Sequence, residues 1–380
     1  MTTTTQHSTA TTFSDLTTLR TGGPIGRLVE TDTEKDFIAA ISAADEAGEP
    51  LLVLGGGSNL VVSDEGFAGT VVRDRRSGIE TVVNGCFGGA NLIIPAGQNW
   101  DDVVAYAVAE DMVGVEALSG IPGSVGAAPV QNIGAYGQEI SGTLALVRVW
   151  DRARARVQTY TVGELGLGYR TSLLKESMYA GDKDGRIWGP TPRYVVLEVQ
   201  LQLRGANLST PIAYSQLADK LDMRSGDRAQ ISQVREAVLA LRRSKGMVLS
   251  EQDRDSWSAG SFFTNPVVPK TEADALPEAA PRYPVYLPTP EVTYRTSNGA
   301  VNPDLVKTSA AWLIEQAGFT RGFDIGGAVA LSAKHTLAIT NTGGGTTADV
   351  VALARHVRAG VQEKFGITLV PEPVLVGVEL

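Results

Sequence analysis

The chain contains few of the residues on which nucleophilic and metal chemistry usually depend. Its 380 residues include three histidines and one cysteine. The single cysteine, Cys86, excludes an internal disulfide and a cysteine-rich metal or iron–sulfur site, so we expect it to be structural, in a reducing, cytoplasmic compartment. We predict no metal site. A Ser-His-Asp hydrolase is disfavoured, because an imidazole must take the hydroxyl proton, while His7 lies in a threonine-rich tail and His356 in a charged, solvent-facing helical pattern.

Long apolar runs and basic clusters are also missing. No segment approaches the ~20 apolar residues that span a bilayer, and the first residues, MTTTTQHSTATT, lack the regions of a signal peptide. We therefore expect no membrane insertion. The net charge is −9, and the densest basic run, Arg152–Arg156, alternates with alanine as a solvent-facing strand edge would, so nucleic acid is not an expected partner. A cleft can still hold an anion through local cations and N–H groups.

The remaining composition is that of an ordinary globular protein, long enough for two or three domains. Residues 1–12 form a low-complexity segment that we predict to be a disordered tail. After it, apolar periodicity and capping residues predict a mixed α+β chain. The predicted strands are 28–30, 51–54, 69–73, 79–83, 92–95, 144–150, 157–161 and 194–203, with strand character in 367–380, and the predicted helices are 32–48, 99–112, 231–243, 309–316 and 347–365.

Glycine-rich loops are the first candidate binding feature. The buried strand at 51–54 runs into Gly55-Gly56-Gly57-Ser58-Asn59, and Ile121-Pro122-Gly123-Ser124-Val125-Gly126 forms a second glycine-dense loop. The first string is neither a Rossmann fingerprint nor a Walker A motif. It could be only a tight turn, but glycine loops also bring backbone N–H groups close to a diphosphate. Two such loops suit a long, flat cofactor lying between them, and FAD has that shape.

Ser261 is the first candidate for chemistry. It stands in Gly260-Ser261-Phe262-Phe263-Thr264-Asn265-Pro266. Without an imidazole partner, this serine is better suited to give a proton to a substrate than to attack one. The alternative is that Ser261 only turns the backbone before Pro266.

Charged residues could meet an anionic substrate. Arg170, after a glycine and an aromatic in LGYRTS, can present its guanidinium to a carboxylate, although most arginines are surface residues. Glu372 is enclosed by prolines in an apolar segment, where ionised carboxylates are rare. Lys245 could be only a helix-end cation, and Tyr214 only a packed aromatic.

Taken together, five strings resemble one enzyme family. LGGGSN, ALSGIPGSVGAAPVQNIGAYG, GYRTS, GSFFTNP and the run from AAWLIEQAGF to EKFGITLVPEPVLVG occur in the order found in UDP-N-acetylenolpyruvoylglucosamine reductases of peptidoglycan synthesis. The resemblance covers residues 17–377. Tyr214, with the stretch around it, is similar to the first type of that family, which keeps an extra tyrosine loop.

The resemblance implies a fold and its division along the chain. The expected architecture is α+β, with a two-part FAD-binding domain of the PCMH or vanillyl-alcohol-oxidase type and a third, α/β substrate-binding domain. The expected parts are residues 13–75 with 366–380, then 76–246, and then 247–365 for the substrate domain. The segments 181–185 and 277–296 are expected to be insertions that alter loops and not chemistry.

The resemblance also implies an activity and roles. NADPH would reduce FAD and leave, UDP-N-acetylglucosamine enolpyruvate would enter the same pocket, and hydride would pass to the β-carbon of the enol ether. Arg170 would hold the carboxylate, Glu372 would donate a hydrogen bond or a proton, and Ser261 would protonate C2. The flavin oxidases and dehydrogenases of the same fold, which act on an alcohol or 2-hydroxy acid, are the alternative.

The remaining implied site residues fall into two groups, and the enzyme is expected to be a monomer. Tyr214 and Lys245 would face the UDP diphosphate or the NADPH phosphates, and Asn265 and Gln316 the sugar or uridine. The cofactor-binding set is Gly55, Gly56, Gly57, Ser58, Asn59, Ile121, Pro122, Gly123, Ser124, Gly126, Asn132, Gly134, Ala135 and Tyr136.

Overall fold

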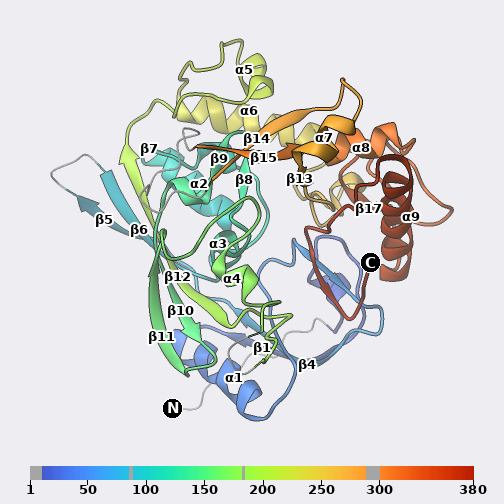
Figure 1. Ribbon diagram of the computed structural model, residues 1–380. Coiled ribbons are helices and arrows are strands. Elements are labelled where there is room, and N and C mark those ends of the chain that lie inside the picture. The colour runs from blue at the N-terminus through green and yellow to red at the C-terminus, as the bar shows by residue number, and fades with distance from the viewer. Residues whose placement is uncertain (1–10, 85–88, 182–184, 288–299) are drawn as a thin grey trace. The chain divides into compact units, whose positions relative to one another are not determined.

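The computed structural model describes residues 11–84, 89–181, 185–287 and 300–380 (Figure 1). Its internal contacts form two compact units. The first unit contains Ile25–Gly56 and Ala68–Ser244, and the second contains the described residues before Ile25 together with Gly57–Phe67 and Lys245–Leu380. The predicted three-part division stays a prediction. Cys86 and residues 1–10 of the predicted tail lie outside the described residues, while Thr12 forms a bridge with Pro24.

The first unit begins with a three-stranded sheet. Its order is β1 (Ile25–Thr31), β4 (Phe67–Asp74), β2 (Leu51–Val53), and β2 and β4 are parallel. Helix α1 (Glu34–Glu46) starts because the Thr33 side chain accepts the Asp36 N–H. Phe37 and Ile41, one turn apart, are 1% and 0% exposed and pack into the core between α1 and the strands.

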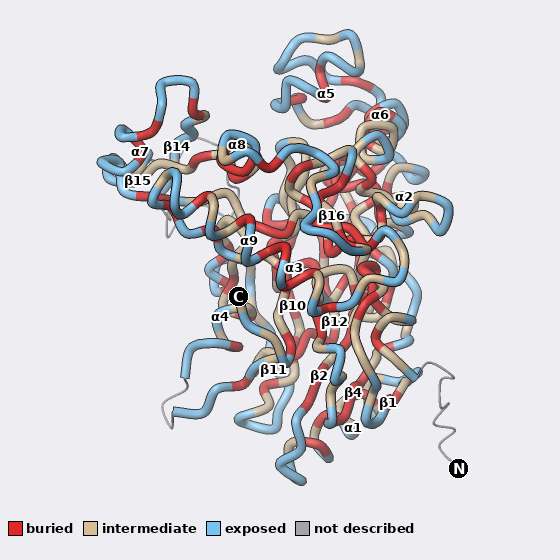
Figure 2. The backbone as a smooth tube through the Cα atoms, turned by 90° about the vertical axis from the view of Figure 1, so that its right-hand side faces the viewer, coloured by how far each residue is buried: buried red, intermediate tan, exposed pale blue. Residues whose placement is uncertain are grey.

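A six-stranded sheet forms the larger part of the first unit. Its order is β11 (Arg156–Thr161), β10 (Leu144–Asp151), β12 (Tyr194–Gly205), β6 (Gly89–Pro95), β5 (Glu80–Asn84), with β7 (Met112–Val113) also paired to β12. Neighbouring strands are antiparallel. Buried residues alternate along β6 and recur along β12, as a half-buried sheet requires, and Figure 2 shows both β10 and β12 largely in the buried and intermediate colours.

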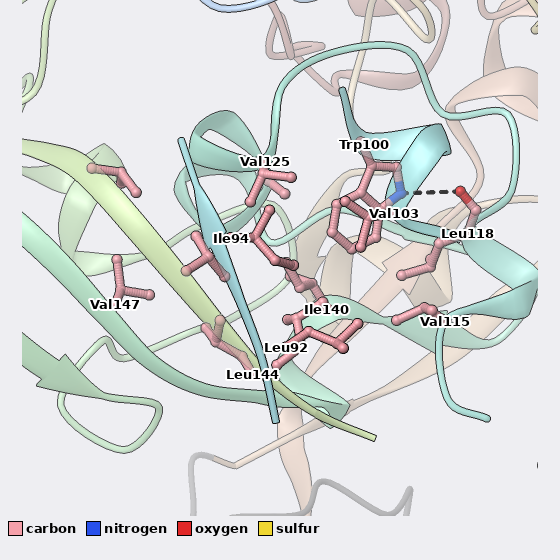
Figure 3. Packing of buried hydrophobic residues seen from close by; sticks show 14 of the residues in the cluster. Leu92, Ile94, Trp100, Val103, Val115, Leu118, Val125, Ile140, Leu144 and Val147 are labelled. Carbon is pink, nitrogen blue, oxygen red and sulfur yellow. Dashed lines mark hydrogen bonds between the residues drawn. The ribbon is translucent and has the colours of Figure 1, made fainter. Parts of the chain in front are cut away.

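Helix α2 (Trp100–Ala109) covers this sheet and completes its core. Trp100, Val103 and Val104 are at most 1% exposed and pack with apolar residues of β6 and β10. Figure 3 shows this packing and a hydrogen bond within it, in which Trp100 Nε1 donates to the Leu118 carbonyl at 3.2 Å. The buried indole N–H is therefore satisfied. The other elements of the unit are η2 (Glu116–Leu118), η3 (Val125–Ala127), α3 (Ala128–Gln131), β8 (Gly134–Ala135), β9 (Gln138–Glu139), η4 (Ile140–Gly142), α4 (Leu173–Glu176), α5 (Ser215–Lys220) and α6 (Ile231–Ser244).

The basic run Arg152–Arg156 corrects one prediction. Residues 152–155 form the turn between β10 and β11, and only Arg156 begins a strand. The Arg152 side chain is 4% exposed because it forms two hydrogen bonds with Asp45 and lies over the Trp188 ring, 4.9 Å from its centroid. The alternation with alanine therefore concealed a buried ion pair between distant segments.

The second unit consists of short elements around one long helix. Its core contains Phe262, Phe263, Leu313 and Val350 among many apolar residues. Helix α9 (Thr347–Phe365) begins with a capping box formed by Thr346 and Asp349. The other elements are η1 (Phe13–Asp15), β3 (Leu60–Val62), η5 (Arg254–Ser256), β13 (Val267–Pro269), α7 (Lys270–Ala275), β14 (Arg282–Tyr286), β15 (Val301–Thr308), α8 (Ala310–Gln316), β16 (Val329–Leu331), β17 (Ile339–Asn341) and β18 (Val374–Val376).

The pairings of this unit are short. β3 and β18 pair in parallel, β16 with β17 antiparallel, and β15 lies between β13 and β14. His356 is exposed on α9, as predicted, and its ring stacks on Phe323. Among the described helices, none combines the length and apolarity that a membrane crossing requires.

Candidate functional site

The two glycine loops meet through their backbones in the first unit. A Cβ placed on Gly56 would lie 2.6 Å from Gly123 Cα, and one on Gly55 would lie 2.5 Å from Ser124 Oγ. At Gly56 the contact is with backbone, so glycine is required there for space and not for turn conformation, whereas at Gly55 the Ser124 hydroxyl could rotate away. The result is a strip of side-chain-free backbone, the kind of surface that admits a diphosphate.

The loop at 121–126 is supported by the residues that follow strand β6. The N–H groups of Val125 and Gly126 donate to Gln98 and Ala96 carbonyls at 2.8 and 2.9 Å. A Cβ on Gly126 would lie 2.6 Å from that of Ala96. Ile121 packs against the sheet core, while Pro122 is half-buried. These contacts hold the loop against the residues that follow strand β6.

Asp101 anchors the entry to this loop, a role the sequence did not reveal. Its carboxylate accepts the Gly120 N–H at 2.6 Å and both terminal nitrogens of Arg235 at 2.7 and 2.9 Å. Burial alone would raise the pKa of Asp101, but the hydrogen bonds from Arg235 and Gly120 outweigh it and hold that pKa below its ordinary value.

The third glycine segment folds into a hairpin. Strands β8 and β9 are joined by Tyr136 and Gly137, with φ of 48° and 86°. Positive φ at both central residues is the pattern of a tight hairpin turn, and the glycine satisfies it without strain. The Tyr136 ring meets Tyr214 edge to face at 5.5 Å. The structure thus brings together two residues predicted for different ligands.

Arg170 lies at the tip of a tight turn. Gly168 and Thr171 exchange main-chain hydrogen bonds of 3.0 and 3.4 Å, and Arg170 has a left-handed φ of 54°. Its guanidinium donates to the carbonyls of Asn132 and Gly134 at 3.3 and 3.0 Å. A non-glycine residue in this region costs about 1–2 kcal/mol, and such strain is often found at functional positions.

Arg242 joins this group from helix α6. Burial lowers the pKa of the Arg242 guanidinium to about 10, while Tyr136 and Asp101 oppose that shift and Arg170 adds to it. Burial also raises the pKa of the Tyr136 hydroxyl. Arg235 and Arg242, two turns apart on α6, share one helix face, which is the signal that could have identified them. Tyr214 is 45% exposed.

The rest of the first glycine loop belongs to the second unit. Gly57 has φ 63°, and a Cβ there would lie 1.9 Å from the Leu16 carbonyl oxygen. Ser58 is half-buried. Asn59 lies against the C-terminal segment, since its carbonyl accepts the Val374 N–H at 3.0 Å and its Nδ2 donates to the Glu372 carbonyl at 3.4 Å.

Ser261 and Glu372 lie on neighbouring backbone segments of the same unit. The Glu372 N–H donates to the Phe262 carbonyl at 2.9 Å, and the Thr264 N–H donates to the Val370 carbonyl at 3.0 Å. Phe262 and Phe263 are 1% and 2% exposed, with their rings edge to face. Both Ser261 and Glu372 are half-buried. The sequence-predicted proton donor and carboxylate are therefore neighbours, although 111 positions separate them.

The predicted substrate-binding residues of the second unit lie at or near the ends of helices α6 and α8. Asn265 Oδ1 accepts the Ala310 N–H at 3.0 Å and so fixes the start of α8. Gln316 is exposed at the other end of α8, where its carbonyl accepts from Lys364. Lys245 is half-buried directly after α6, before Gly246 with φ 66°. Among the described residues, no group of three or more His, Cys, Asp or Glu is placed to hold a metal.

Comparison with known proteins identifies the family. The FAD binding domain profile matches residues 26–159, and the profile of the UDP-N-acetylenolpyruvoylglucosamine reductase C-terminal domain matches residues 252–376. A UDP-N-acetylenolpyruvoylglucosamine reductase from Thermobifida fusca is 49% identical over 377 residues, covering 97% of each chain. One from Nocardia farcinica is 50% identical over 369 residues, covering 97% of this chain and 89% of that protein. This chain belongs to the UDP-N-acetylenolpyruvoylglucosamine reductase family.

The fold of this family member agrees with a solved relative. The crystal structure of UDP-N-acetylenolpyruvylglucosamine reductase from Thermus caldophilus matches with a TM-score of 0.61 and 24% identity, covering 96% of this chain and 97% of that one. The predicted α+β class is confirmed, with an FAD binding domain over residues 26–159 and the C-terminal domain of the family over residues 252–376. The FAD prediction is confirmed as well, and the side-chain-free strip at Gly55, Gly56 and Gly123 fits that cofactor.

Proposed function

We propose that this chain is an NADPH-dependent flavoenzyme that reduces the enolpyruvyl ether of UDP-N-acetylglucosamine enolpyruvate to UDP-N-acetylmuramate for peptidoglycan synthesis. Family membership and the FAD binding domain support the reaction. The main-chain hydrogen bond between Glu372 and Phe262, beside Ser261, is the structural observation that carries the assignment of residues. Bound FAD, once reduced by NADPH, supplies the hydride.

Ser261 acts as the proton donor in this proposal. Hydride addition at the β-carbon of the enol ether leaves an electron pair on C2, adjacent to the carboxylate. The Ser261 hydroxyl gives its proton to C2, and solvent then returns a proton to the serine oxygen, so the reaction consumes one hydride and one proton. A carbanion is basic enough to take a hydroxyl proton, so no histidine is needed. The apolar burial of Phe262 and Phe263 keeps the serine in place.

Arg170 and Glu372 stabilise the charge that develops in the same step. Arg170 binds the substrate carboxylate, onto which negative charge moves as hydride arrives, and Glu372 donates a hydrogen bond or proton to it. Such groups accelerate a reaction when they are aligned before the charge appears. The strained turn at Arg170 and its two carbonyl contacts are consistent with such alignment.

The substrate and NADPH use one pocket in turn. Tyr214 and Lys245 contact phosphates, and Asn265 and Gln316 contact the sugar or uridine. The glycine loops hold FAD together with the main chain of Asn132 and with Gly134, Ala135 and Tyr136. We place the enzyme in the cytoplasm, because its proposed substrates are soluble nucleotide derivatives, and we propose that it acts as a monomer.

Three observations on the purified protein test the proposal. The visible spectrum should show a bound flavin, NADPH should bleach it without oxygen, and UDP-N-acetylglucosamine enolpyruvate should then restore the oxidised spectrum. A preparation that contains no flavin and does not take up FAD would contradict the assignment of FAD as the cofactor. A flavin that NADPH bleaches but that the enol ether does not reoxidise would contradict the proposed substrate. Reduction of the flavin by a 2-hydroxy acid instead of NADPH would favour a dehydrogenase.

A further inference from the structure

The side chain of Asn132 ties together the two segments that present Arg170. Its Nδ2 donates to the Gly168 carbonyl at 2.7 Å, at the base of the Arg170 turn. The Arg170 guanidinium in turn donates to the carbonyl of Asn132 itself, at 3.3 Å. Each segment therefore holds the other, and we name this reciprocal pair of contacts the Asn132–Arg170 clasp.

From this geometry we infer that Asn132 is a positioning residue for Arg170 in the reduction of the enol ether. The inference rests on the proposed function, in which Arg170 binds the substrate carboxylate. It assigns to the Asn132 side chain a task other than contact with FAD. The amide would act only through the direction and rigidity of the guanidinium.

The burial and conformation of Asn132 support this assignment. The residue is 0% exposed and has a left-handed φ of 43°, a conformation that asparagine adopts more readily than most residues. Its amide group is engaged inside the protein, since Nδ2 also donates to Glu139 at 3.2 Å and Oδ1 accepts the Ser141 N–H at 3.4 Å. A buried amide whose donors are both used contributes order to the segments it joins.

Further contacts fix the same two segments. Ser172 Oγ donates to the Val130 carbonyl at 2.8 Å, and Lys175 Nζ donates to Gln131 Oε1 at 2.9 Å and to the Arg170 carbonyl at 3.3 Å. They stabilise the backbone on either side of the turn. Asn132 differs from them because its amide bonds the turn at Gly168 and its carbonyl receives the guanidinium.

The strain at Arg170 explains why such a clasp is needed. A left-handed arginine relaxes to another conformation unless surrounding contacts over-determine it. A charge-stabilising group loses much of its effect when it must reorganise during the reaction. Losing the Asn132 amide should therefore slow the step in which charge reaches the carboxylate, and leave flavin reduction by NADPH intact.

The experiment compares the two half-reactions in Asn132→Asp, Arg170→Ala and the double variant. Asn132→Asp keeps the shape but removes both donors and places a carboxylate beside Glu139. We expect flavin reoxidation by the enol ether to slow about tenfold, against about 10²–10³-fold for Arg170→Ala. In the double variant we expect the rate of Arg170→Ala alone, because a residue that acts through Arg170 has no effect without it.

Matched variants separate positioning from folding and from cofactor binding. Asn132→Gly keeps the left-handed backbone and should show the same slow half-reaction if Asn132→Asp does not fold. Asp111→Gly, at an exposed left-handed position with φ 51°, should behave as the wild type in both half-reactions.

The remaining outcomes count against the inference in different ways. If the rate losses of the two single variants multiply in the double variant, the positioning role alone is refuted. Loss of FAD in Asn132→Gly would refute it as well. An Arg170→Ala variant with unchanged reoxidation would remove Arg170 from the proposed mechanism and the clasp with it.

Discussion

The N–H of Glu372 donates at 2.9 Å to the carbonyl of Phe262, which is the residue directly after Ser261. This contact joins two main chains, and the Phe262 ring beside it is 1% exposed. Backbone pairing and core packing therefore contribute to the positions of both Ser261 and Glu372. Substituting either side chain should leave the geometry of the other unchanged.

Replacing Ser261 with alanine should separate the two halves of the reaction. The variant should bind FAD and accept electrons from NADPH as the wild type does, because the hydroxyl serves neither step. Reoxidation by the enol ether should slow about 10²–10⁴-fold, the usual contribution of a positioned proton donor. Anaerobic stopped-flow absorbance measures both rates. Ser42→Ala, in helix α1, is the matched control, and unchanged reoxidation in Ser261→Ala would remove the serine from the mechanism.

Replacing Glu372 with glutamine should affect the same half-reaction for a different reason. Glutamine retains the size and the backbone pairing but cannot give a proton or carry charge. We expect reoxidation to fall about 10²–10³-fold, as for the loss of one stabilising group, with flavin content unchanged. Glu379→Gln, on an exposed side chain nearby in sequence, is the control. Equal rates in Glu372→Gln and Glu379→Gln would exclude proton transfer from Glu372 and leave only hydrogen-bond donation, which glutamine retains.

Replacing Gly56 with alanine should weaken FAD binding. The new methyl group would lie 2.6 Å from Gly123 Cα, so the two loops would have to separate. Overpacking of this kind costs about 1–3 kcal/mol, and the displaced backbone is the strip proposed to hold the cofactor. Flavin content after purification and FAD titration by fluorescence measure the effect. Gly163→Ala, where a Cβ meets nothing within 4 Å, should retain FAD; full retention by Gly56→Ala would contradict the assignment.

The ion pair of Asp101 with Arg235 should give a pH-dependent contribution to stability. Because its folded pKa lies below its ordinary value, the unfolded chain binds the proton more readily, and unfolding free energy rises with pH across this range. Asp101→Asn should therefore cost about 1 kcal/mol at pH 7, a figure reduced for partial exposure. The difference from wild type should shrink as the pH falls below about 4.

Urea unfolding of both proteins at several pH values measures this difference. Asp102→Asn, at the exposed neighbouring position, is the matched control and should show a smaller change at pH 7. A difference between wild type and Asp101→Asn that is constant with pH would contradict the ion-pair explanation.

Much of the fold could be predicted because its signals are local. Helices α1 and α9 were predicted from capping residues and apolar periodicity, and the structure places their ends within two residues of the prediction. Strands β13, β14 and β15 were missed, because each contains or adjoins a proline and their pairing joins segments up to about 40 positions apart. The burial of Arg152 could not be predicted either, because it depends on a contact with Asp45, which is distant in the sequence.

In the candidate site, too, local sequence signals could be predicted and long-range contacts could not. The strings around Gly55, Ser261 and Glu372 could be singled out because each is unusual in itself. The ties that hold the site in shape, such as Asp101 with Arg235 across 134 positions, involve ordinary residues whose types and spacing carry no signal. Only the folded chain shows which of many acids meets which of many arginines.

The parallel pairing of β3 with β18 has a consequence for synthesis of the protein. Leu60–Val62 leaves the ribosome early, yet its partner Val374–Val376 lies near the end of the sequence. In a nascent chain, β3 therefore stays unpaired until β18 has been synthesised. The second unit can complete its fold only after nearly the whole chain has been translated. Premature termination even a few residues upstream of Pro371 would remove β18 and Glu372 together, and leave β3 without its partner strand.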